Sequence, residues 1–222
     1  TQNQSSAASD VYKRQVESLP IPEAIAAPVT LPPPITTPDD WRQRFSSAEQ
    51  ELSTPIEGGE PAAFRHTQGY FASNAAQSYK ETRNALDGWE NSTKFSLWLA
   101  CGAISAREVV RQLRLHEAQQ GANESTYWIY FELLWREYFQ WYAHRHGDSI
   151  NAFQGIATST PNTSFYPQRF RKWCLGNTPY PIVNACMKQL NDSGYMSNRG
   201  RQLVASCLVH ELALDWRYGA AY

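Results

Sequence analysis

The sequence predicts an all-α protein, and three observations support this fold class. From Gly58 onward, apolar residues recur at spacings of three and four, which is the period of one face of a helix. No segment alternates apolar and polar residues in the way of a half-buried strand. Hydrophobic residues make up 42% of the 222 residues, enough for one sizeable domain with its own core.

The first segment, residues 1–57, is expected to be a proline-rich linker that is partly irregular. Eight prolines interrupt it, and the stretch 31–38 favours an extended polyproline-like chain. A short helix is expected over 39–51, with Asp39 or Asp40 as its N-cap. The helical domain is then expected to cover residues 58–222.

Within this domain the spacing of apolar residues predicts a series of amphipathic helices. Ser92, Ser105 and Asn198 stand where N-caps are expected, because a short polar side chain can accept a bond from the first turn. The predicted helices cover residues 60–72, 93–102, 105–120, 124–146, 180–192 and 198–213.

The charge pattern leaves two interpretations open. The net charge is −1, yet residues 165–222 carry seven Lys or Arg against three acids, while 39–60 carry six acids against two arginines. Either the C-terminal part faces an anionic ligand, or both charge groups are ordinary solvated faces.

Several common features are not expected. The four cysteines, Cys101, Cys174, Cys186 and Cys207, have no metal-ligand spacing and indicate reduced residues of an intracellular protein. His66 and His116 have no nearby ligand partners, and His144 and His146 lie at a helix C-terminus where cations are favourable, so no metal site is expected. Neither a membrane span nor a signal peptide is indicated, and a cytoplasmic location is therefore expected.

Aromatic residues are unusually frequent, with 8 Trp and 12 Tyr. Mixed with Arg, Asn and Glu on helices, they are typical of a site for a planar ligand or for stacked bases. An aromatic core without a ligand is the alternative.

Three local patterns suggest where such a ligand binds, and the first lies at the start of a predicted helix. This run is either a phosphate site or an ordinary cap, and its residues are Ser92, Thr93, Lys94, Phe95 and Ser96.

On the long helix, Glu132, Trp135 and Arg136 share a face, which could hold a base edge or be a surface ion pair beside a packed indole. Arg199 and Arg201 stand in a first helical turn, where cations are unfavourable, so a facing acid or phosphate is expected.

Motifs in a fixed order resemble the cryptochrome/DNA photolyase family, and the wording of three of them resembles its DASH branch. The resemblance covers roughly residues 10–222. The motifs are Tyr79–Asn84 (YKETRN), Ser92–Ser96 (STKFS), Asn123–Trp128 (NESTYW), Phe131–Glu137 (FELLWRE), Tyr180–Met187 (YPIVNACM), Met196–Gln202 (MSNRGRQ) and Leu214–Arg217 (LDWR).

The resemblance implies roles for individual residues. Those implied to bind FAD are Tyr79, Ser92, Thr93, Lys94, Phe95, Ser96, Trp128, Asn198 and Arg201. Those implied to contact DNA, or to line the pocket where a damaged pyrimidine pair meets the flavin, are Arg83, Glu132, Trp135, Arg136, Asn198 and Arg199. Trp173 and Trp216 are implied to be the outer two members of a tryptophan electron-transfer chain.

The implied activity is light-driven, FAD-dependent repair of cyclobutane pyrimidine dimers, preferentially in single-stranded DNA. Two alternatives stay open: a photoreceptor without repair, and a remnant that binds flavin and DNA only weakly, so that whether the chain is an enzyme is not decided. The family's N-terminal α/β antenna domain, with its chromophore site, has no counterpart here. Its last flavin contacts are expected beyond Tyr222, which predicts that Arg201 lacks its acidic partner.

Overall fold

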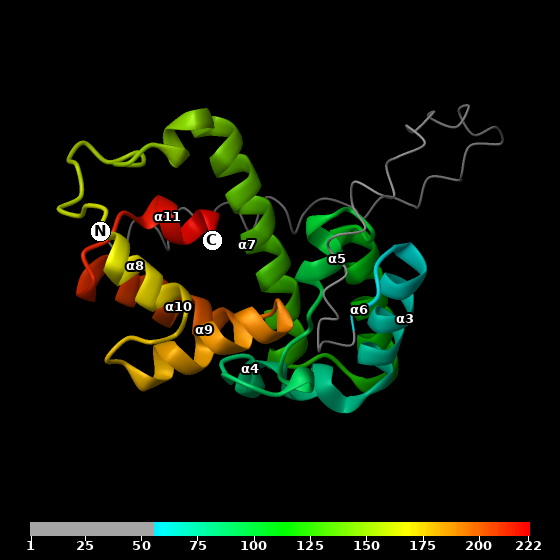
Figure 1. Cartoon of the computed structure of the whole chain (residues 1–222). Coiled ribbons are helices and arrows are strands. Elements are labelled where there is room, and N and C mark those ends of the chain that lie inside the picture. The colour runs from blue at the N-terminus through cyan, green and yellow to red at the C-terminus, as the bar shows by residue number, and fades with distance from the viewer. Residues whose placement is uncertain (1–55) are drawn as a thin grey trace, which may run out of the picture.

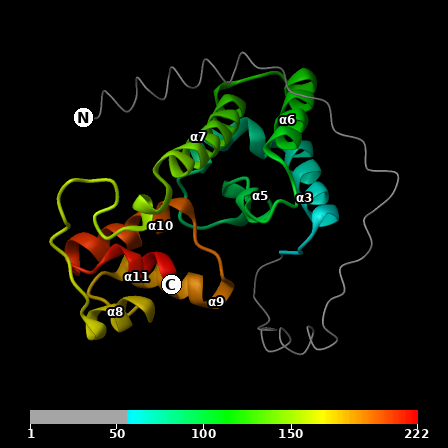
Figure 2. The same ribbon diagram turned by 90° about the horizontal axis from the view of Figure 1, so that it is seen from above.

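The computed structural model describes residues 56–222, and the helices in this range gather into two groups (Figures 1 and 2). The expected helix at 39–51, and all but the last two residues of the expected linker, lie outside the described residues. The described chain contains no strand; one isolated parallel bridge joins Ser164 and Leu214. The all-α prediction is therefore confirmed for this part of the chain.

The first helical group runs from α3 to η4 and contains the long helix α7. Its members are α3 (Glu60–Ala72), the 3₁₀ turn η2 (Asn74–Ser78), α4 (Tyr79–Thr82), η3 (Trp89–Asn91), α5 (Ser96–Ala100), α6 (Ala106–Gln120), α7 (Glu124–His146) and η4 (Gly147–Asn151).

The second helical group is smaller and lies at the opposite side of the views in Figures 1 and 2. It contains α8 (Pro167–Cys174), α9 (Pro181–Ser193), α10 (Asn198–Ser206), the π-helical turn η5 (Cys207–Glu211) and α11 (Trp216–Ala221).

Each group has its own hydrophobic core. In the first, Val109 and Leu113 of α6 meet Ile129 of α7 and Tyr70 of α3, at the spacings that the helical pattern predicts. In the second, Met187 of α9 packs with residues of α8, α10 and η5. Two separate cores leave room for a cavity where the groups meet.

The segment between α4 and α5 connects the two groups. Asn84 Oδ1 accepts a hydrogen bond from Arg199 at 2.8 Å, and Asp87 Oδ1 accepts one from Gln189 at 3.2 Å. Leu86 packs against the second core. This segment therefore holds α9 and α10 against the first group.

Four predicted helices, α3, α6, α7 and α9, are confirmed within a residue or so. Ser105 caps α6 by accepting from the Glu108 N–H, as expected. The caps predicted at Ser92 and Asn198 are wrong. Ser197, not Asn198, caps α10 by accepting from the Gly200 N–H. Helix α5 begins at Ser96, four residues after Ser92, because Lys94 has a left-handed backbone with φ 57.

The helix predicted over 198–213 is interrupted. It continues as α-helix to Ser206 and then widens into a π-helical turn, in which Leu212 N–H donates to Cys207 C=O at 3.0 Å. The wider turn allows both Leu208 and Leu214 to reach the second core, where they are 2% and 0% exposed. Helices α8 and α11 were not among the predicted elements.

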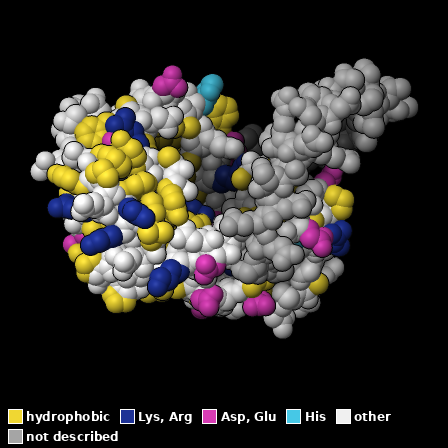
Figure 3. Space-filling model, in the orientation of Figure 1, with side chains coloured by type: hydrophobic (Ala, Val, Ile, Leu, Met, Phe, Trp, Pro, Cys, Tyr) yellow, Lys and Arg dark blue, Asp and Glu magenta, His cyan; other side chains and the backbone are white. Residues whose placement is uncertain are grey.

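Charged and apolar side chains gather over the second group (Figure 3). Arg169, Arg171 and Lys172 of α8 are exposed beside the exposed side chains of Phe165 and Leu175. Basic residues of the C-terminal part are thus exposed on the surface of α8. This exposure is compatible with both interpretations of the charge pattern, an anionic ligand and an ordinary solvated face. Three cysteines are buried and free, as expected, whereas Cys101 is exposed.

Candidate functional site

A cavity of about 1060 Å³ opens between the two helical groups. One side comes from α4, the segment 85–97 and α7, and the other from the end of α9 and the start of α10. Most residues that the sequence indicated for a ligand site line it. They are Tyr79, Arg83, Ser92, Thr93, Lys94, Phe95, Ser96, Glu132, Arg136, Asn198 and Arg201.

The expected phosphate segment is a loop rather than the first turn of a helix. The hydroxyls of Ser92, Thr93 and Ser96 still line the cavity. The Thr93 carbonyl accepts a hydrogen bond from Nε2 of His66 at 2.8 Å, so α3 supports the loop from behind. The donors here are therefore side-chain hydroxyls and backbone groups of a loop that a separate helix holds in place.

Lys94 is 5% exposed and makes its contacts within the protein. Its Nζ donates to Ser92 Oγ at 2.8 Å and lies 5.3 Å from the ring centroid of Trp89 and 4.9 Å from that of Tyr195. Both distances are within the range of a cation–π contact. Trp89 belongs to the first group and Tyr195 to the second, so Lys94 lies between the groups.

The α7 side of the cavity carries an ion pair. Arg83 Nη2 lies 2.5 Å from Glu132 Oε1, and the same guanidinium lies over the Trp128 ring at 4.8 Å. Burial raises the pKa of Glu132, and the positive charge of Arg83 opposes that shift. Burial, together with the Glu132 charge, also raises the pKa of Tyr79 to about 12, against the effect of Arg83. At neutral pH the Tyr79 hydroxyl is therefore a hydrogen-bond donor.

The cations of the cavity differ in how far they are already engaged. Arg136 donates to the Leu99 carbonyl and to Gln140, each at 3.3 Å. Arg201 is exposed, and among residues 56–222 no carboxylate forms an ion pair with it. Arg201 is thus free to receive an anionic group in the cavity.

Some predicted site residues lie outside the cavity lining. Trp135 packs in a row of aromatic rings along α7, 5.9 Å from Phe131 and 5.6 Å from Phe139, and its role at the pocket stays a prediction. Arg199 is exposed and donates to Asn84 and to Gln202 at 2.8 Å each. Trp128 lies beneath Arg83, at the margin of the first core.

The two tryptophans of the implied electron-transfer chain are both held by backbone carbonyls. Trp173 is 3% exposed and donates to the Val204 carbonyl at 3.0 Å. Trp216 opens α11 and donates to the Phe153 carbonyl at 3.0 Å. No ring contact joins the two indoles within the described chain, and their role in electron transfer stays a prediction.

Sequence reasoning missed part of the cavity lining, chiefly Trp89, Tyr195 and the turn at Asp87–Gly88. The signal that could have found the turn is the Asp-Gly pair itself. Gly88 has φ 98, and a Cβ there would lie 2.3 Å from Asn91 Nδ2. No comparable signal marks Tyr195, which reaches the site only through tertiary packing.

The residues present fit a large ligand that carries both phosphates and a planar ring system. The volume lies slightly above the usual range for small-molecule pockets, which is about 300–1000 Å³. Hydroxyls and the free cation Arg201 suit phosphate oxygens, and Phe95, Leu97 and Ile129 offer apolar surface to a ring. Within residues 56–222, no group of His, Cys, Asp or Glu side chains is arranged to hold a metal ion. No helix in this range is long and apolar enough to cross a membrane.

Comparison with known proteins shows which family this chain resembles. Residues 128–222 match the family model described as the FAD binding domain of DNA photolyase. The chain is 65% identical over 170 residues to a cryptochrome DASH of Idiomarina loihiensis, covering 77% of this chain and 38% of that protein. It is 56% identical over 211 residues to a cryptochrome DASH of Vibrio parahaemolyticus, covering 95% and 47%. The chain thus spans less than half the length of these curated relatives.

Solved structures of a cryptochrome and a photolyase also superpose on this chain. A Synechocystis cryptochrome superposes with a TM-score of 0.74 at 40% identity, over 76% of this chain and 35% of that one. A bacterial class III photolyase from Agrobacterium tumefaciens superposes with a TM-score of 0.66 at 27% identity, over 94% and 44%.

Proposed function

The chain belongs to the cryptochrome/DNA photolyase family, as a DASH-type member with its helical FAD-binding domain, and from this premise we propose that it acts in blue-light-driven repair of cyclobutane pyrimidine dimers, preferentially in single-stranded DNA. One observation carries the proposal: the lining of the same cavity combines a set of hydroxyls and a cation with the Arg83–Glu132 ion pair. The first set suits FAD phosphates, and the second suits a base edge.

On the cofactor side, the residues of the loop orient the ligand. Ser92, Thr93 and Ser96 supply hydroxyl donors to phosphate oxygens, and Arg201 supplies the unpaired positive charge. Asn198 and Tyr79 line the same cavity and present an amide and a protonated hydroxyl to the ring system. When bound, FAD supplies the light-driven electron transfer that splits the dimer.

On the DNA side, Glu132 and Arg136 meet the base edges. The Glu132 carboxylate accepts hydrogen bonds from pyrimidine N–H groups, while Arg83 keeps it oriented and balances its charge. A raised pKa lets Glu132 hold a proton over a wider pH range, so that it also donates one to a carbonyl oxygen of the dimer. The preference for single strands follows because an unpaired dimer costs least to flip into a cavity.

A photoreceptor without repair is the second candidate, and the position of Trp135 favours it. An indole outside the cavity lining is not placed to stack on a flipped dimer. The two functions share the cofactor side of the cavity and differ on the DNA side.

The test is repair of an oligonucleotide that carries one thymine dimer, in single- and double-stranded form, under blue light and in the dark. Light-dependent repair that is faster on the single strand, and strongly reduced in Glu132→Gln, is the expected result. Flavin binding without repair of either substrate would favour the photoreceptor.

A further inference from the structure

We propose that Lys94 is a positioning residue that joins the two helical groups at the cavity, with its ammonium between the rings of Trp89 and Tyr195, and that it sets the shape of the Ser92–Ser96 loop from within the protein. We call these three residues the aromatic clamp. The inference deepens the proposed function, because this loop is the proposed phosphate site.

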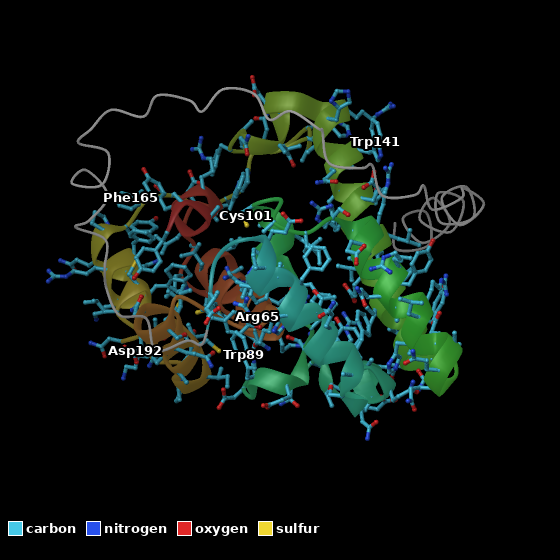
Figure 4. All side chains as sticks on the ribbon, turned by 90° about the vertical axis from the view of Figure 1, so that its right-hand side faces the viewer. Arg65, Trp89, Cys101, Trp141, Phe165 and Asp192 are labelled. Atoms are coloured by element: carbon cyan, nitrogen blue, oxygen red, sulfur yellow. The ribbon has the colours of Figure 1, made fainter. Side chains whose placement is uncertain are left out.

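The geometry of the clamp places one ring from each group on the same ammonium. Nζ of Lys94 lies 5.3 Å from the Trp89 centroid and 4.9 Å from the Tyr195 centroid. The two rings also meet edge to face, with centroids 6.1 Å apart and planes at 61°. Figure 4 shows Trp89 at the place where α9 approaches the helices of the first group.

Burial makes these ring contacts important to the cation. Lys94 is 5% exposed, and no ion pair with a carboxylate engages it within residues 56–222. A buried ammonium is unfavourable unless other groups replace its hydration. Ser92 Oγ, at 2.8 Å, and the negative faces of two rings supply that replacement.

The backbone of Lys94 shows what the clamp holds. Its φ of 57 is a left-handed conformation that a residue with a Cβ adopts only when its surroundings enforce it. The clamp fixes the side chain on one side, and the bond from His66 Nε2 fixes the preceding carbonyl of Thr93 on the other. Together they orient the hydroxyls of Ser92 and Thr93 toward the cavity.

A phosphate-ligand role and the clamp role make different predictions. If Nζ binds phosphate, removing its charge weakens FAD binding whether or not the Trp89 and Tyr195 rings are present. If Nζ acts through the clamp, removing either ring has the same effect as removing the charge. Substitution by Met or Arg keeps a Cβ at position 94, so the backbone strain is the same in every variant that is compared.

The experiment measures FAD affinity and the free energy of unfolding of the cofactor-free chain for five variants. Lys94→Met, Trp89→Leu and Tyr195→Leu are expected to weaken FAD binding about tenfold each. The double variant Lys94→Met/Trp89→Leu should be no weaker than either single one. Lys94→Arg, which keeps a cation over the rings, should stay within about twofold of the wild type.

A spectroscopic measurement on the cofactor-free chain makes the test independent of FAD. In proton NMR, the ε-methylene resonances of Lys94 should be shifted upfield by ring currents, and Tyr195→Phe should keep that shift while Trp89→Leu reduces it. Ordinary lysine shifts in the wild type would overturn the clamp, as would full FAD affinity of both ring variants beside a weakened Lys94→Met. Shifted resonances in a chain that binds no FAD would leave the clamp intact and overturn the proposed function instead.

Discussion

The guanidinium of Arg83 and the carboxylate of Glu132 form an ion pair in the lining of the cavity, with Nη2 and Oε1 2.5 Å apart. Arg83 follows the short helix α4, and Glu132 lies in the middle of α7, so the pair joins two elements of the first helical group. Both side chains are partly shielded, with 20% and 35% of their surface exposed. The pair therefore has electrostatic consequences that a fully solvated pair lacks.

The first prediction concerns stability against pH. Burial raises the folded-state pKa of Glu132 above its ordinary value of 4.5, so the folded protein binds the proton more tightly than the unfolded chain. Stability from this group is present below pH 4.5 and is lost as pH rises through the folded-state pKa. Urea unfolding should be measured for the wild type and Glu132→Gln from pH 4 to 7. The free energy of unfolding of the wild type should fall relative to that of the variant as pH rises. Parallel stability curves would contradict the assignment.

Asp215 should behave in the opposite way. It caps α11 through the Arg217 N–H at 3.0 Å and pairs with the Arg217 side chain, which lowers the Asp215 pKa below 3.8. Its contribution is present above pH 3.8 and is lost as pH falls through the folded-state pKa.

Asp215→Ala should lower the free energy of unfolding at pH 7 by about 1–3 kcal/mol, the range for a lost cap and a charged hydrogen bond. Asp215→Asn keeps a capping oxygen and serves as the control, with a smaller loss. Equal unfolding midpoints for wild type and the alanine variant would show that the cap is unimportant.

Two glycines give a matched test of backbone packing in the loops. Both Gly176 and Gly102 have positive φ, 61 and 75, but a Cβ at Gly176 would lie 2.7 Å from the backbone oxygen of Asn184, whereas Gly102 has open space. Gly102→Ala should cost about 1 kcal/mol of stability from strain alone. Gly176→Ala should cost at least about 2 kcal/mol, because the clash is with backbone. Equal losses in denaturant unfolding would refute this ranking.

DNA binding should depend steeply on salt. If the basic residues Arg136 and Arg199 contact phosphates, removal of either one reduces the slope of log affinity against log salt by about 0.7 for a single strand. Fluorescence anisotropy with a labelled oligothymidine measures this slope. Arg111→Ala is the control, since Arg111 pairs with Glu108 on α6 outside the cavity lining. An affinity that does not change with salt would contradict a DNA interface at these residues.

The sequence was sufficient to predict α3, α6 and α7 because their apolar periodicity is long and their boundaries are marked locally. Ser105 stands at the start of α6 and caps it as expected, and Gly121 follows its last residue. Short elements such as α8, with eight residues, have too few apolar positions to establish a period. The π-helical turn at Cys207 depends on the packing of Leu208 and Leu214, which no local pattern specifies.

The site was predictable in its membership but not in its conformation. Many of the motif residues from Tyr79 to Arg201 line one cavity, whereas Trp128, Trp135 and Arg199 do not. The predicted helix start at Ser92 failed because Tyr195, distant in sequence, helps to hold Lys94 in a left-handed conformation. Helical spacing likewise could not decide which flank of α7 faces the cavity: Ile129, Glu132, Leu133 and Arg136 do, and Trp135 does not.

The most direct test of FAD binding in the cavity is to measure the affinity of the chain of 222 residues for FAD, by absorption spectroscopy and equilibrium dialysis. We expect one FAD per chain, with flavin absorption bands that sharpen on binding. We also expect an affinity that falls about tenfold or more in Arg201→Gln, the scale of a lost charge-assisted bond. A folded chain, with the helical circular dichroism of the structure, that binds no FAD at millimolar concentration would contradict the central claim.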